Sequence, residues 1–340
     1  MNKYTEYILE QAENLLAIDS PSGFTQAVTD YLMKEYKDLG YSPAKTTKGG
    51  VLVDLGGKGN GLLLTAHVDT LGGMTAQIKQ NGRLRMTPVG GMNPNNAETE
   101  NCRIYTFDGR EYTGTLQLQN ASIHVNKDFN DKSRSFDEME ILIDEPVSSK
   151  EDVEALGIMT GNYICFDPRT TITPSGYIKS RFLDDKLSTA ILLGYAKYLK
   201  DENVSLTRRV YQHITVFEEV GHGGSASTPD DVTEILSVDM GCVGDGLECT
   251  EHQVSICVKD SNGPYNYDIV KGLIKAAKDN NIDFAADVYP HYGSDAGAAL
   301  QAGYDLRHGL IGPGVYASHG YERSHTDGVE NTLLLLKAYI

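Results

Sequence analysis

The sequence predicts an α/β fold made of a layered α/β domain with a β-rich insert. Near the start of the chain, two helical patterns that end near residues 18 and 40 precede apolar, β-rich stretches at 50–55 and 61–67. Helices followed by strands in this order are typical of a layered α/β domain. The glycine-rich segment 56–61 between the two stretches indicates a hairpin. After residue 177 we expect helices at 185–200, 267–280 and 324–340, and strands at 209–217, 235–240, 283–288 and 306–314.

The middle of the chain differs from both ends in its predicted secondary structure. From about residue 74 the sequence consists of short β-like pieces separated by turn residues, and only a short helix is expected, near 149–155. We therefore predict an inserted β-rich domain at 74–176 within a discontinuous domain formed by residues 1–73 and 177–340. The alternative is that the middle segment irregularly continues one sheet.

Composition and charge exclude several classes of protein. The 340 residues are 40% hydrophobic and 23% charged, as in ordinary globular proteins. The net charge of −17 argues against a nucleic-acid partner, which would require a basic face. No apolar run approaches the ~20 residues needed to span a bilayer, and the acidic N-terminal stretch lacks a signal-peptide core. Five cysteines without CxxC spacing favour reduced thiols. We expect a cytoplasmic protein without a membrane partner.

The stretch 61–73, GLLLTAHVDTLGG, carries the first candidate site residues. Its apolar run predicts a strand buried on both faces, and His67 and Asp69 at its C-terminal end point to the same side. Open α/β sheets bind their ligands at this end of the strands. The pair could be a metal ligand with its partner carboxylate, a catalytic pair, or a structural histidine satisfied by a neighbouring aspartate.

Four further apolar runs end on side chains that can bind metal. They end at Asp184-Asp185, Glu218-Glu219, Asp239 and His325. Each has a simpler explanation, namely a helix N-cap, a solvated acidic pair, a strand-end turn residue and a helix-start histidine. Adjacent buried carboxylates repel one another unless a divalent cation neutralises them. Nitrogen and oxygen ligands gathered at several strand ends therefore suit a zinc or cobalt site.

Six motifs in order carry a family resemblance over essentially the whole chain. They are AHVD at 66–69, FLDDK at 182–186, FEEVG at 217–221, SVD at 237–239, YGSDAG at 292–297 and ERSH at 322–325. This series resembles the M42 metallo-aminopeptidases, which include the tetrahedral (TET) and glutamyl aminopeptidases and some proteins named endoglucanases. The resemblance implies a layered α/β/α zinc-peptidase catalytic domain with an inserted β-barrel or PDZ-like domain for dimerisation.

The resemblance also implies a site with two divalent metal ions, zinc or cobalt. The implied metal ligands are His67, Asp184, Glu219, Asp239 and His325. Asp184 would bridge both ions, Glu218 would be the general base, and Asp69 would orient and polarise His67. The last motif, ERSHTDG, departs from the commoner form, so His319 is the alternative to His325. Lys186 replaces an arginine of many members, and Asp295 lies in a motif that lines the family's active site without an assigned role.

The implied function is removal of N-terminal residues from short peptides by a metal-activated water. The implied assembly is a homo-oligomer, from a dimer to a dodecamer. The alternatives are a related metal-dependent deacylase or carboxypeptidase, or a non-catalytic metal-bound assembly protein. A glycoside hydrolase is disfavoured because metal ligation explains the carboxylates better and the chain has no tryptophan for sugar stacking.

Overall fold

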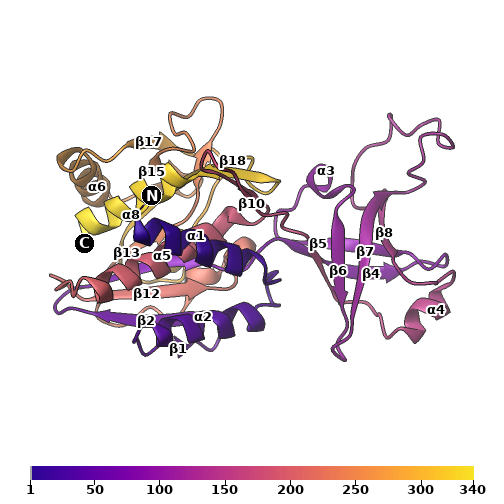
Figure 1. Ribbon diagram of the computed structural model, residues 1–340, viewed down its shortest axis with the longest axis horizontal. Helices are drawn as coiled ribbons and strands as arrows, with labels where there is room; N and C mark the ends of the chain where they lie inside the picture. The colour runs from indigo at the N-terminus through magenta and orange to yellow at the C-terminus, as the bar shows by residue number, and fades with distance from the viewer. Residues whose placement is uncertain (1) are drawn as a thin grey trace. The chain divides into compact units, whose positions relative to one another are not determined.

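The computed structural model describes residues 2–340, which form two compact units (Figure 1). The first unit comprises the chain up to Thr70 together with Arg169–Ile340, and the second is Leu71–Pro168. The expected insert at 74–176 starts and ends later than this second unit. Residues 169–176 stay in the first unit because their strand pairs with its sheet. Met1, which the expected domain includes, lies outside the described residues.

A mixed 13-stranded sheet forms the centre of the first unit. Its main path runs in the order β1 (Ala44–Lys45), β2 (Val51–Gly56), β12 (Val210–Thr215), β3 (Gly61–His67), β13 (Val232–Val238), β18 (Arg307–Tyr316), β19 (Glu322–His325), β11 (Tyr177–Ser180) and β10 (Thr171–Ile172). Off this path, β18 also pairs with β14 (Gly241–Val243) and β15 (Val254–Asp260), and β15 pairs with β16 (Gly263–Pro264) and β17 (Phe284–Val288). The strands β12, β3 and β13 are parallel neighbours, so their C-terminal ends meet at one edge.

The predicted hairpin between β2 and β3 is wrong. Strand β12 lies between them, antiparallel to β2 and parallel to β3. The glycine at position 57 has a different structural explanation. A Cβ atom on Gly57 would lie 1.9 Å from the carbonyl oxygen of Arg208, so the backbone that leads into β12 passes too close for any side chain. Close approach of two chain segments and a left-handed φ of 85° both favour glycine at this position.

Helices cover both faces of the sheet. The helix α5 (Leu183–Asp201) packs on β3, β13 and β18, with α1 (Lys3–Leu16) and α8 (Thr326–Tyr339) against it, while α2 (Gln26–Asp38) packs on β2 and α6 (Tyr267–Asp279) on β15 and β18 (Figure 1). The helix α7 (Asp295–Gln301) also packs on β3, β13 and β18.

Hydrogen bonds from two strands of the sheet place α5 and α7 on its opposite faces. The side chain of Gln212 donates to the Leu192 carbonyl in α5, whereas the Ser237 hydroxyl accepts from the Ala296 N–H in α7. Gln212 and Leu236 both pair with Leu64, one from each side of β3, so their side chains face the same side of the sheet. Ser237 is the residue after Leu236. Successive residues of a strand face opposite sides, so the sheet lies between two helical layers, and the layered α/β/α fold is confirmed.

Local sequence explains most of these elements. Asn2 caps α1 by accepting from the N–H groups of Tyr4 and Thr5, and the helix buries an apolar stripe that includes Ile8 and Leu15. Every residue of β3 is buried, as its apolar run predicts. Strand β15 and helix α7 were not expected. The helix α7 reads DAGAALQ, whose small residues give no clear apolar stripe.

The second unit is a closed six-stranded barrel (Figure 1). Its strands run in the order β4 (Gly72–Ile78), β5 (Leu84–Val89), β8 (Met139–Ile143), β7 (Glu111–Leu118), β6 (Asn101–Tyr105) and β9 (Tyr163–Phe166), with short helices α3 (Pro94–Ala97) and α4 (Lys150–Ala155). Inward-facing residues such as Ile104, Leu116 and Ile141 are completely buried. The β-rich character predicted for this part of the chain is confirmed.

Over residues 2–340, no helix combines the length and apolar character that crossing a membrane requires. All five cysteines are free thiols, and four of them are buried. The predicted absence of a disulfide framework is therefore confirmed.

Candidate active site

Three of the predicted residues converge where the parallel strands end. His67 is the last residue of β3, Asp239 directly follows β13, and Glu218 begins the short 3₁₀ helix η1 (Glu218–Val220) after β12. His67 and Asp239 are almost completely buried. The strand ends border a cavity of about 690 Å³, which is lined by Asp184, Glu218, Glu219, Gly221, Asp239, Met240, Cys242, Ser261, Asn262, His291, Tyr292, Gly293, Ser318 and His319.

Asp184 lies at the centre of the candidate ligands. Its Oδ1 atom is 3.1 Å from Nε2 of His67, and its Oδ2 atom is 3.5 Å from Nε2 of His319. His319 Nε2 is also 3.5 Å from a carboxylate oxygen of Glu219. Asp184 thus belongs to two groups of close donor atoms, one with His67 and Asp239 and the other with Glu219 and His319.

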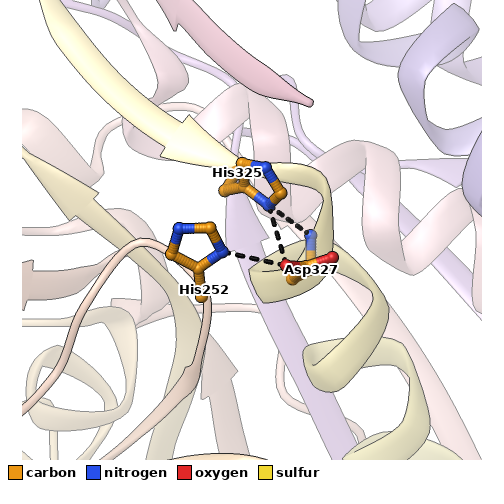
Figure 2. Close-up of side chains that lie close together, drawn as sticks. All are labelled: His252, His325 and Asp327. Carbon is orange, nitrogen blue, oxygen red and sulfur yellow. Dashed lines mark hydrogen bonds and ion pairs between the residues drawn. The ribbon is translucent and has the colours of Figure 1, made fainter. Parts of the chain in front are cut away.

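The expectation for the last ligand requires a correction, because the structure brings His319 and not His325 to this group. His325 lies in a separate cluster with His252 and Asp327 (Figure 2). Both of its ring nitrogens are engaged there, Nε2 with the carbonyl of Ser175 at 2.8 Å and Nδ1 with the Asp327 N–H at 3.1 Å. His325 is the N-cap of α8, which is the simpler explanation that the sequence left open.

The carboxylates of the cavity destabilise one another's charged forms. Burial, together with repulsion from neighbouring carboxylates, raises the pKa of Glu218 and Glu219 well above the usual range and that of Asp239 to about 7. Burial also favours the neutral form of Asp184, but hydrogen bonds from His319 and His67 outweigh it and lower its pKa. These acids are thus not a solvated surface group.

This arrangement fits two divalent cations. Two donor groups share one carboxylate, and both contain the nitrogen and oxygen donors that zinc and cobalt accept. Among residues 2–340, the buried Oε1 atom of Glu219 has no hydrogen-bond partner, so it is available as a ligand. Bound cations would compensate the repulsion among the buried carboxylates.

Asp69 acts on its surroundings differently from the expectation. Its main-chain carbonyl accepts a hydrogen bond from Nδ1–H of His67 at 2.9 Å, whereas its carboxylate lies 3.6 Å from that nitrogen. This hydrogen bond orients the ring so that Nε2 of His67 faces Asp184, where it can bind a metal ion once its proton is lost. The carboxylate of Asp69 instead accepts from the Ser22 hydroxyl at 2.5 Å and from the Glu218 N–H at 3.2 Å. It therefore fixes the backbone of Glu218.

Glu322 is a supporting residue that the sequence did not single out. Its carboxylate accepts the N–H of Asp184 at 3.0 Å and the N–H of His319 at 2.9 Å. It is almost completely buried, and burial together with Asp184 raises its pKa to about 8. His319 has a left-handed φ of 61°, which this hydrogen bond helps to hold. Glu322 stands inside the ERSH motif, but nothing in the local pattern distinguishes it from a surface acid.

Asp185 and Asp295 support the backbone near the cavity without lining it. Asp185 is fully buried, and its carboxylate accepts the His67 N–H at 3.3 Å, so it is not a solvent-exposed helix cap. Asp295 accepts the Thr215 hydroxyl at 2.5 Å. A Cβ atom on Gly223 would lie 2.3 Å from its Oδ1 atom. Asp295 therefore packs directly against the loop that follows the Glu218-Glu219 pair.

Comparison with known proteins agrees with the motif series. The family model described as M42 glutamyl aminopeptidase matches residues 49–335. "Putative aminopeptidase YhfE" of Bacillus subtilis (strain 168) is 44% identical over 334 residues, which cover 98% of this chain and 96% of the relative. The fold is similar to that of aminopeptidase APDkam598 from the archaeon Desulfurococcus kamchatkensis, with a TM-score of 0.87, 23% identity, and coverage of 99% and 95%.

A second solved structure has the same fold. The TET1 peptidase of Pyrococcus horikoshii gives a TM-score of 0.85 at 22% identity, with 97% of this chain and 98% of that chain covered. That peptidase can assemble into a tetrahedron or a large octahedral shell. At this level of identity the likeness concerns the fold.

Proposed function

Because this chain belongs to the M42 glutamyl aminopeptidase family of peptide hydrolases, we propose that it is a dinuclear metal-dependent aminopeptidase acting on short peptides. One observation carries the proposal: Asp184 belongs to two groups of close donor atoms, so one carboxylate can bridge two ions. His67 and Asp239 would complete the first site, and Glu219 and His319 the second.

Bound divalent ions supply Lewis-acid polarisation and lower the pKa of water toward neutrality. The chain's own residues handle the proton. Glu218 lines the cavity, and its carboxylate lies 3.7 Å from Nε2 of His67, close to the proposed ligands. It would accept the proton of the attacking water and deliver it to the leaving amine. The hydrogen bond from its N–H to Asp69 holds this base in position.

The charge of the cavity favours recognition of a free amino terminus. Four carboxylates line it, and no lysine or arginine is among its lining residues in the described chain. A C-terminal carboxylate would find no basic side chain to pair with there, whereas a free α-amino group needs none. This supports an aminopeptidase over the carboxypeptidase alternative.

The same cavity favours a neutral N-terminal side chain. Apart from the proposed ligands and the base, its lining side chains are uncharged or histidine, and include Met240, Cys242, Asn262 and Tyr292. An acidic substrate side chain would lose water there without gaining a cationic partner from these residues. We therefore propose neutral over acidic N-terminal residues, although the family is named for glutamyl substrates.

The barrel unit is proposed to mediate assembly into a homo-oligomer. It exposes large apolar side chains, among them Phe107, Ile123, Val125 and Met159. Exposed apolar groups of this kind are candidates for subunit contacts. Native mass spectrometry of the wild type and of Phe107→Ser tests this, and a monomeric wild type would refute it.

The test of the proposed chemistry is Glu218→Gln. The variant should bind the same number of divalent ions as the wild type but lose nearly all hydrolysis of aminoacyl chromogenic substrates, because an amide cannot accept the proton. Glu111→Gln, an exposed position in the barrel unit, is the matched control and should retain activity. Peptides with a blocked N-terminus should resist the wild type. A fully active Glu218→Gln protein, or equal cleavage of N-acetylated peptides, would overturn the proposal.

A further inference from the structure

We propose that His252, His325 and Asp327 form an additional binding site for a divalent transition metal, separate from the candidate active site. His252 lies in the loop before β15, His325 ends β19, and Asp327 is in the first turn of α8. Figure 2 shows the three side chains directed toward one another. None of them lines the catalytic cavity. The cluster thus contains the histidine that the motif series suggested as a ligand and that the candidate active site does not use.

The three donor atoms have nearly the spacing of a coordination sphere. Oδ2 of Asp327 lies 2.9 Å from Nδ1 of His252 and 3.2 Å from Nδ1 of His325. All three donor atoms lie within 4.8 Å of one another. Ligands bound tetrahedrally to zinc at about 2.0–2.2 Å are separated by roughly 3.3 Å. Only small side-chain movements are therefore needed to place an ion among them.

Contacts of the Nε2 atoms of His325 and His252 leave their Nδ1 atoms available to bind a metal ion. Nε2–H of His325 donates to the Ser175 carbonyl at 2.8 Å, so its Nδ1 carries a lone pair. Nε2 of His252 lies 3.5 Å from the Tyr177 hydroxyl. Histidines that bind metal commonly engage their other ring nitrogen with a carbonyl or another polar group in this way. Both rings can therefore present Nδ1 to the same ion.

Hydrogen bonds and nearby positive charges oppose the binding of an ion to this cluster. The Nδ1 atom of His325 accepts the Asp327 N–H, and Nδ1 of His252 is hydrogen-bonded to the Asp327 carboxylate. An ion must therefore displace both hydrogen bonds and work against the positive end of the α8 dipole, which lies nearby. The guanidinium of Arg323 stacks on Tyr177 and pairs with Glu251, which offsets part of its charge.

Two imidazoles with one carboxylate favour zinc, nickel or cobalt over magnesium or calcium, which prefer oxygen ligands. The site is accessible, because the His252 side chain is 41% exposed and that of Asp327 is 59% exposed. Water can therefore complete the coordination of an ion bound there.

The experiment is a cobalt titration of the full-length protein after its tight sites have been filled with zinc. The wild type should bind one more ion than His252→Gln, and cobalt absorption in the visible range should report nitrogen ligands. Magnesium and calcium should not compete. His124→Gln removes an exposed histidine of the barrel unit and is the matched control, which should bind cobalt like the wild type. The readout is a difference between variants, so it does not depend on how many ions the catalytic site holds.

A second variant protects the test against a folding defect. Asp327→Asn removes the carboxylate charge with little change in shape, and should weaken cobalt binding at least tenfold. Cobalt should also raise the thermal unfolding temperature of the wild type by a few degrees, but not that of His252→Gln. Binding of no extra ion by the wild type, or equal binding by folded His252→Gln, would mean that the cluster only caps α8 and would overturn the proposal.

Discussion

The Nε2 atom of His319 lies 3.5 Å from Oδ2 of Asp184, and this pair completes the second group of donor atoms in the cavity. Asp184 therefore has one histidine on each of its carboxylate oxygens, His67 on Oδ1 and His319 on Oδ2. A bridging carboxylate between two sites has this arrangement of partners.

His319→Ala should lose metal from the second site and reduce turnover roughly 100-fold or more, because one of its ligands is removed. Metal analysis after dialysis and steady-state kinetics measure both effects. His325→Asn is the comparison, since asparagine can still cap α8. It should retain the catalytic ions, and the opposite pattern of metal loss would restore His325 as the ligand.

Glu322→Gln should weaken metal binding in the group formed by Asp184, Glu219 and His319 by about 10–100-fold. One end of the glutamine amide is a donor, so it would face a backbone N–H of Asp184 or His319 that now donates to a carboxylate. Titration against a competing chelator measures the affinity of each site. The group that contains His67 and Asp239 should lose less affinity than the group that contains His319, and equal affinity losses at both groups would indicate a general structural defect.

Substrate preference should follow the neutral lining of the cavity. We expect kcat/KM for leucyl or methionyl p-nitroanilides to exceed that for glutamyl and aspartyl p-nitroanilides by roughly tenfold or more, since the cavity offers an acidic side chain no lysine or arginine among its lining residues. The measurement is a panel of aminoacyl substrates on the metal-loaded protein. A preference for glutamyl substrates would contradict the proposed specificity while leaving the aminopeptidase chemistry intact.

His213 should make the protein sensitive to acid. It is buried in β12, where burial, with a smaller contribution from Lys48, lowers its pKa to about 4. The unfolded chain binds this proton near pH 6.5, so the neutral folded form contributes stability above that pH. The contribution is lost as the pH falls from 6.5 through 4, and amounts to about 3 kcal/mol at 1.36 kcal/mol per unit.

His213→Leu should remove this slope. The free energy of unfolding from denaturant titrations at pH 7.5 and pH 5 is the measurement, taken as the difference between variant and wild type. His124→Leu, at an exposed position, should keep the wild-type slope. An unchanged slope in the His213 variant would mean that other groups cause the acid sensitivity.

Local sequence was sufficient for much of the fold and for most of the candidate site. The apolar run that ends at His67 predicts a strand buried on both faces, and β3 is such a strand. Parallel strands end at a common edge, so His67, Glu218 and Asp239 were expected to meet there, and they do. The first prediction succeeds because a short continuous run of apolar residues indicates a strand that is buried on both faces.

Contacts between distant segments decided what the sequence could not. The glycines before β3 indicate a hairpin in the sequence, but in the structure β12 lies between β2 and β3. His319 and His325 are only six residues apart, and the sequence analysis left both open as the last ligand. The pairing of β19 with β11 places His325 opposite Tyr177, while His319 precedes β19 and reaches Asp184. Sheet pairing is a long-range property, and it determined which histidine faces the cavity and which one forms a separate cluster with His252 and Asp327.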